Sequence, residues 1–209
     1  MTSPGRSRPK SRGSTTADAE RVHAESRQAW RDWLADNHTR TTGVWLVSNK
    51  AHTGKPRMTY EESVEEALCF GWIDSVQRTV DDERAMLWFS PRRKGSGWSR
   101  PNKLRIERLQ RAGLLRAAGR RAVEAAKTDG SWNALDEVEN LVIPEDLGAA
   151  LDATSNARRH FEAFPRSVRR GILEWIATAK RPETRQRRVG ETAQLAERNE
   201  RANQWRPNR

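Results

Sequence analysis

Residues 59–90 constrain the fold most, because they predict a helix and two strands in immediate succession. Thr59 and Glu62 have the spacing of a capping box, in which the hydroxyl accepts from the Glu62 amide and the carboxylate accepts from the Thr59 amide. Gly71 is placed to end this helix in the left-handed conformation. The two strands are predicted over residues 72–80 and 84–90. The acidic turn between them makes this pair a β-hairpin.

The helix that follows Thr59 is expected to bury one face, because apolar residues recur along it at helical spacing. These residues are Tyr60, Val64, Ala67 and Leu68. A second helix is predicted over residues 18–37, with Ala29, Trp30, Trp33 and Leu34 on its apolar face. The β-branched run at residues 43–50 predicts a strand.

Beyond residue 99 the pattern is helical. Ser99 is expected to cap a helix, and further helices are predicted to begin at Leu114, Pro144, Ser155, Ser167 and Pro182. The helix after Ser167 has the strongest apolar stripe, which includes Ile172 and Ile176. A core face explains this stripe better than docking on a membrane or a partner helix. We therefore expect an α+β protein, a small antiparallel sheet packed by helices followed by a helical C-terminal part.

The 209 residues fit one domain with a helical appendage. The expected parts are a disordered basic arm (1–17), an α+β core domain (18–130), a helical C-terminal region (131–202) and a tail (203–209). The single cysteine, Cys69, excludes an internal disulfide framework. No apolar stretch approaches about 20 residues, so no membrane span is expected. The N-terminus lacks an apolar signal region, and the expected location is cytoplasmic.

The formal charge of +11 suggests a polyanionic partner. Basic residues are densest between Trp88 and Arg121, where Glu107 is the sole acid. The segment Arg100–Arg121, together with the N-terminal arm, is a candidate nucleic-acid surface. The alternatives are a solvated face or pairing with acidic helices, including the acid-rich helix at residues 60–70.

The loop at residues 88–99 is the candidate binding site. Arginine guanidinium groups and a lysine offer charge to a phosphate or carboxylate, the hydroxyls and the start of a helix offer donors, and the indole offers a stacking face. The candidate ligand-binding residues are Asp74, Arg92, Arg93, Lys94, Ser96, Trp98, Ser99 and Asn102. The alternative is a hairpin exit held by Trp88 and Trp98 in the core, with the arginines extending into water. Asp74 would then form a buried ion pair with Arg92 or Arg93.

No catalytic set, cofactor signature or metal site is indicated. The carboxylates of Glu61, Glu62, Glu65 and Glu66 share one side of a helix, and facing the basic segment or water explains them better than acid–base catalysis. Cys69 lies on the same line of that helix, where neighbouring carboxylates disfavour a thiolate. The histidines lack metal-ligand spacing.

Three segments in register resemble the YdeI/OmpD-associated (bacteriocin-protection) family. They are TYEESVEEALCFGWIDS, WFSPRRKGSGWSRPN and AKRPETRQRRV, and the resemblance spans roughly residues 22–200. It implies a role in resistance to bacteriocins or cationic antimicrobial peptides and an envelope protein, a porin, as a possible partner. It implies no catalytic residues. The sequence departs from the family in its basic N-terminal arm and in its tail, NQWRPNR.

We therefore expect a non-enzymatic cytoplasmic stress or envelope-defence protein that binds an anionic small molecule or a phosphate-bearing ligand. One alternative is a sequence-independent nucleic-acid-binding protein. The other is an enzyme acting on a small phosphorylated metabolite, with Asp74 as its base.

Overall fold

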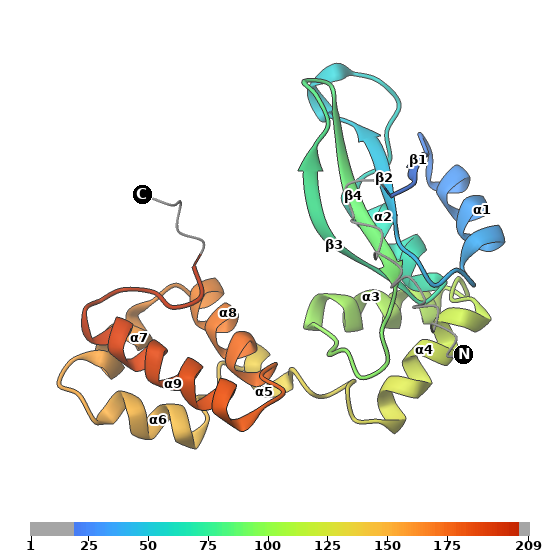
Figure 1. Ribbon diagram of the computed structural model, residues 1–209. Helices are drawn as coiled ribbons and strands as arrows, with labels where there is room; N and C mark the ends of the chain where they lie inside the picture. Colours follow the sequence, from blue (N-terminus) through green and yellow to red (C-terminus); the bar gives the residue numbers. More distant parts are fainter. Residues whose placement is uncertain (1–18, 205–209) are drawn as a thin grey trace, which may run out of the picture. The chain divides into compact units, whose positions relative to one another are not determined.

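The computed structural model describes residues 19–204, which divide into two compact units (Figure 1). The first unit contains residues 19–93 and 108–122, and the second contains 94–107 and 123–204. The basic arm expected at the N-terminus and most of the C-terminal tail lie outside the described residues. The sequence placed the domain boundary near residue 130, whereas the packing assigns residues 94–107 to the second unit.

The first unit is built on a four-stranded sheet with the order β1-β2-β4-β3. Its elements are β1 (Arg21–His23), α1 (Arg27–Asn37), β2 (Val44–Asn49), the 3-10 turn η2 (Ala51–Thr53), α2 (Tyr60–Cys69), β3 (Trp72–Thr79) and β4 (Arg84–Pro91). Strands β2, β4 and β3 are antiparallel, as expected, and β1 adds in parallel to β2. With the helical second unit, this sheet confirms the α+β class.

The prediction of one helix over residues 18–37 was wrong in its first half. Strand β1 occupies that half and pairs Val22 with Leu46, which buries the Val22 side chain. Helix α1 begins only after Ser26, whose hydroxyl accepts a hydrogen bond from the Ala29 amide at 3.1 Å. A Ser cap competes with helix continuation, and pairing with β2 then decides the conformation of the residues before it.

Aromatic rings form much of the first unit's core. Trp30 of α1 stacks on Trp33, with ring centroids 5.2 Å apart, and also contacts Phe89 of β4. The Trp33 ring meets Trp72 of β3 edge-on at 5.8 Å. The Trp30 indole donates to the Ser63 carbonyl of α2 at 3.1 Å, which ties the two helices together. A few large rings thus join both helices to the same face of the sheet.

Helix α2 has the predicted capping box, since Thr59 and Glu62 exchange both hydrogen bonds. Val64, Ala67 and Leu68 are buried as expected. Tyr60 was expected to be buried with them but, as the first residue of the helix, it is 53% exposed. Gly71 has φ 77°, the left-handed stop that was predicted.

Two helices of the basic segment follow the hairpin and contribute residues to both units. They are α3 (Arg100–Arg111) and α4 (Ala117–Thr128). The backbone amide of Lys103 donates to the Ser99 carbonyl at 3.0 Å, so α3 begins directly after Ser99, as the sequence suggested.

The rest of the second unit is helical, as expected. Its helices are α5 (Asp136–Glu139), α6 (Glu145–Asp152), α7 (Ala157–Ala163), α8 (Arg166–Ala177) and α9 (Pro182–Glu197). The caps differ slightly from those predicted: Asn156 precedes α7 and Pro165 precedes α8. Ile172 and Ile176 of α8 are fully buried in this unit's core, so the apolar stripe is a core face. Within residues 19–204, no helix has the length and apolar character needed to cross a bilayer.

Candidate functional site

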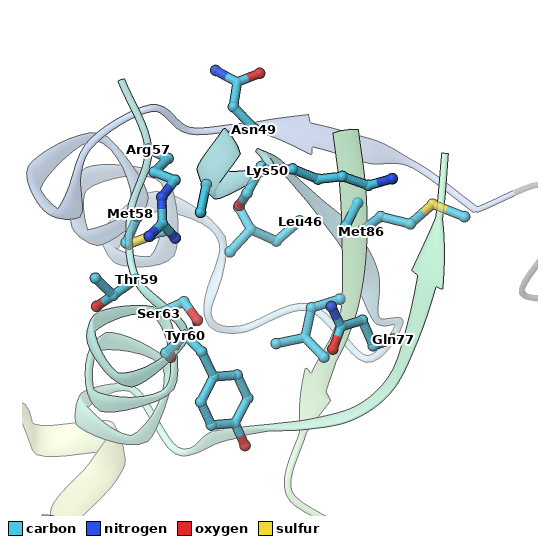
Figure 2. Close-up of a pocket in the computed structure, with 14 residues that line it drawn as sticks. Leu46, Asn49, Lys50, Arg57, Met58, Thr59, Tyr60, Ser63, Gln77 and Met86 are labelled. Carbon is cyan, nitrogen blue, oxygen red and sulfur yellow. Dashed lines mark hydrogen bonds between the residues drawn. The ribbon is translucent and has the colours of Figure 1, made fainter. Parts of the chain in front are cut away.

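A pocket of about 310 Å³ lies in the first unit between the sheet and the start of α2 (Figure 2). The alternation of β-strand side chains creates its apolar wall, because Leu46 of β2 and Leu87 of β4 are paired and face the hollow together. Met58, the residue before the α2 cap, is buried at its side. Gln77 reaches the hollow from β3, after a register shift between Asp74 and Gln77.

The rim of this pocket carries two cations and, among its lining residues, no carboxylate. Lys50 is anchored, since its Nζ donates to the Asp81 carbonyl at 2.7 Å. Asn49 holds the following loop by donating to the Pro56 carbonyl at 2.9 Å. Within residues 19–204, the Arg57 guanidinium and the Gln77 amide make no side-chain hydrogen bond. The pocket therefore combines an apolar wall with polar groups that are free to meet a ligand.

Tyr60 connects this pocket to two residues of the predicted site. Its side chain lines the hollow, and its hydroxyl donates to Asp74 Oδ2 at 2.8 Å. Asp74 in turn attracts Arg92 electrostatically. Burial lowers the pKa of Arg92 to about 10, and the charge of Asp74 opposes that shift. The opposite charges of Asp74 and Arg92 thus attract each other. This favours a structural role for Asp74 over the role of a catalytic base.

The other predicted residues have different surroundings. Arg93 is exposed and belongs to the first unit, whereas the residues from Lys94 to Asn102 belong to the second. Trp98 is 2% exposed and packs against Trp132, with ring centroids 5.0 Å apart. Other residues of the protein thus cover the Trp98 indole, as expected from the alternative in which Trp98 belongs to the core.

The polar groups around Trp98 are also engaged. Asn102 is 9% exposed, and its side-chain oxygen accepts from Arg105 at 2.7 Å. Lys94 is exposed, while Ser96 and Ser99 are half-buried. Hydrogen bonds from Ser131 and from the Gly95 amide, helped by the charge of Lys94, hold the pKa of Asp129 below its usual value. The loop is therefore tied to residues 129–132 of its own unit.

Acidic residues compensate part of the basic segment. In the first unit Arg108 forms ion pairs with Glu61 at 2.7 Å and with Glu65 at 3.0 Å. In the second unit Lys103 pairs with Asp136, and the charge of Arg100 acts on the Glu139 carboxylate. Pairing with acidic helices, one of the alternatives left open by the sequence, thus accounts for these cations.

Glu66 has a separate role inside the first unit. Its side chain is nearly inaccessible, and it accepts from Arg27 at 2.6 Å and from Arg31 of α1. These ion pairs fix α1 to α2. They leave Glu66 no part in acid–base chemistry, in line with the structural interpretation of the glutamates.

Sequence reasoning missed the pocket residues Lys50, Arg57 and Gln77. Residues 51–57 form no motif that marks them in the sequence, and Gln77 is one polar residue in an exposed strand. A signal was present, because Lys50 and Arg57 bracket a turn between a buried strand and a capped helix. Among the described residues there is no cluster of His, Cys, Asp and Glu that could hold a metal ion.

Two different family models match two parts of the chain. Residues 22–122 match the model of a domain of unknown function (DUF8412). Residues 140–199 match the family described as Bacteriocin-protection, YdeI or OmpD-Associated. Comparison with curated proteins and with solved structures gave no match. The family that the sequence suggested is thus confirmed through its C-terminal part, while two of the three resembling segments fall under the other model. Over residues 140–199, the chain is therefore similar to the family described as Bacteriocin-protection, YdeI or OmpD-Associated.

Proposed function

We propose that this protein is a non-enzymatic binding protein that holds a small amphipathic anion in the pocket beside α2. The observation that carries the proposal is the composition of the pocket: an apolar wall, the cations Lys50 and Arg57, and no lining carboxylate. An anionic head group gains from this charge balance, and a hydrocarbon body gains from burial against Leu46 and Leu87.

The size of the pocket limits the ligand. Ligand pockets usually measure about 300–1,000 Å³, so a hollow of about 310 Å³ suits a short-chain molecule. Arg57 supplies the charge partner, because its guanidinium makes no hydrogen bond with another side chain among residues 19–204, although its charge also acts on the Glu62 carboxylate. Gln77 can donate or accept a further hydrogen bond. The start of α2 is not needed as an anion site, since the Glu62 carboxylate already occupies it.

The biological role that we propose is protection against bacteriocins or cationic peptides, as the description of the C-terminal family suggests. The protein would act in the cytoplasm as a stress or envelope-defence factor. Binding of the ligand by the first unit would then be the first step of that protection. The exposed Arg93 remains a second place for the same anion, and the experiment below separates it from the pocket.

Isothermal titration with octanoate tests the proposal, with octanol as a control that lacks the charge. Octanoate should bind the wild-type protein more tightly than octanol does. Arg57→Gln should weaken octanoate binding about tenfold or more, because a hydrogen bond to a charged group is lost. The matched control is Arg93→Gln, an exposed arginine of the loop, which should bind octanoate like the wild type.

Two results would reject this assignment. If neither octanoate nor octanol binds the wild type, the pocket is not a site for a small amphipathic anion. If Arg93→Gln abolishes binding while Arg57→Gln does not, the loop is the site. A cellular assay addresses the role: cells expressing the wild type should survive a cationic peptide better than cells expressing Arg57→Gln at equal protein level.

A further inference from the structure

A second hollow in the first unit is independent of the pocket beside α2. It measures about 510 Å³ and lies where α1, the end of α2 and the start of α4 meet. Its lining includes Arg31, His38, Phe70, Arg116 and Arg121. Basic groups from α1 and from the start of α4 therefore surround one concavity, and Phe70 at the end of α2 adds an apolar surface.

The charges around this hollow are unequally compensated. Arg31 shares the Glu66 carboxylate with Arg27, and a second nitrogen of its guanidinium donates to the Leu114 carbonyl at 3.2 Å. Arg116 and Arg121 form no ion pair with any residue in the described part of the chain. Asp32 is the one carboxylate among the lining residues. An excess of positive charge therefore remains at the start of α4.

The backbone that carries these arginines is held in place. The Arg116 amide donates to the Cys69 carbonyl at 3.1 Å, which fixes the start of α4 against the end of α2. The Arg31 guanidinium lies 5.8 Å from the centre of the Phe70 ring, and this buried ring forms part of the floor. Side chains that project from a fixed frame into one hollow lose less freedom when they bind a ligand.

We propose that this hollow is a binding site for a compact phosphoryl anion, held chiefly by Arg116 and Arg121. Planar guanidinium groups match phosphate oxygens with paired hydrogen bonds, which favours phosphate over a simple point-charge interaction. Ala117 and Ala118 of the first turn of α4 also line the hollow, next to Arg116. The concave shape favours a compact ligand over an extended polymer.

Titration with pyrophosphate at low ionic strength tests this site, because pyrophosphate has no apolar body to enter the first pocket. The double variant Arg116→Gln/Arg121→Gln should weaken binding about tenfold or more. The matched control is Arg159→Gln/Arg198→Gln, which removes the same charge from exposed positions of the second unit and should bind like the wild type. Asp32→Asn should tighten binding, because it removes the one opposing carboxylate of the lining.

The outcomes distinguish this site from the first pocket. Arg57→Gln should leave pyrophosphate binding unchanged, and Arg116→Gln/Arg121→Gln should leave octanoate binding unchanged. Sedimentation with phosphatidylcholine vesicles containing phosphatidic acid shows whether a lipid head group can supply the phosphate. Vesicle binding that is lost in the Arg116/Arg121 variant supports the same site.

Three outcomes would overturn the inference. One is the absence of pyrophosphate binding to the wild type. Another is equal weakening in both arginine pairs, which would reveal a net-charge effect. The third is binding of duplex DNA without competition by pyrophosphate, which would identify the basic segment as a nucleic-acid surface.

Discussion

Gly119 lets helix α4 lie directly against the C-terminal end of α2. A Cβ atom at this position would come within 2.4 Å of the Cys69 carbonyl oxygen and 2.7 Å of the Leu68 carbonyl oxygen. Both neighbours are backbone atoms of a packed helix, so neither can turn aside as a side chain could. Gly119→Ala therefore tests how rigidly these two helices are joined.

The expected loss of stability in Gly119→Ala follows from two opposing effects. Overpacking of this kind typically costs about 1–3 kcal/mol, and the severity of the contact indicates the upper part of that range. Replacing glycine by alanine inside a helix returns about 0.4–1 kcal/mol through the unfolded chain. The free energy of unfolding should thus fall by about 2 kcal/mol.

Urea denaturation followed by tryptophan fluorescence and circular dichroism measures the change. Gly190→Ala in α9 is the matched control, because no heavy atom beyond its own helix backbone and chain neighbours lies within 4 Å of the added Cβ. It should stabilise the protein by about 0.5–1 kcal/mol. Equal stabilities for Gly119→Ala and wild type would refute the reasoning, as would a loss of similar size in Gly190→Ala.

Two further predictions concern buried titratable groups. Burial raises the pKa of Glu139, but hydrogen bonds from Arg170 and from the Arg100 amide outweigh burial and leave the pKa below its usual value of 4.5. The ionised Glu139 therefore stabilises the folded protein above about pH 4.5. This stabilisation is lost as the pH falls through the pKa of Glu139 in the folded state. Unfolding at a series of pH values should show Glu139→Gln less stable than wild type at neutral pH, with the gap closing in acid; a constant gap would contradict this. Burial, together with the charge of Glu66, raises the pKa of Cys69 to about 11, and the side chain is inaccessible. Iodoacetamide at about pH 8 should therefore label Cys69 slowly in the native protein and rapidly in guanidinium chloride, and rapid native labelling would show the thiol to be open.

Local signals predicted much of the fold. The capping box at Thr59, the left-handed stop at Gly71 and the antiparallel hairpin were all anticipated, because each depends on residues close in sequence. Strand β1 was missed because its conformation depends on pairing with Leu46, more than twenty residues away. The exposure of Tyr60 was missed because periodicity does not show how far the first turn of a helix is covered by its neighbours.

The candidate site was harder to predict for a related reason. Composition identified the basic loop but could not show that Trp132 covers Trp98. The pocket beside α2 arises from β2, β3, β4 and a turn, and its polar groups are far apart in sequence. Asp74 was singled out as a ligand-binding residue, and in the structure it accepts from the Tyr60 hydroxyl and interacts with the charge of Arg92.

The irregularity in β3 has a consequence for association between chains. Strand β3 is one border of the sheet, and the shift between Asp74 and Gln77 interrupts its regular pairing. The opposite border, β1, has only three residues. A border strand that is short or bulged is a poor template for adding a strand from another molecule. Both border strands of the sheet therefore disfavour edge-to-edge aggregation, including at high protein concentration.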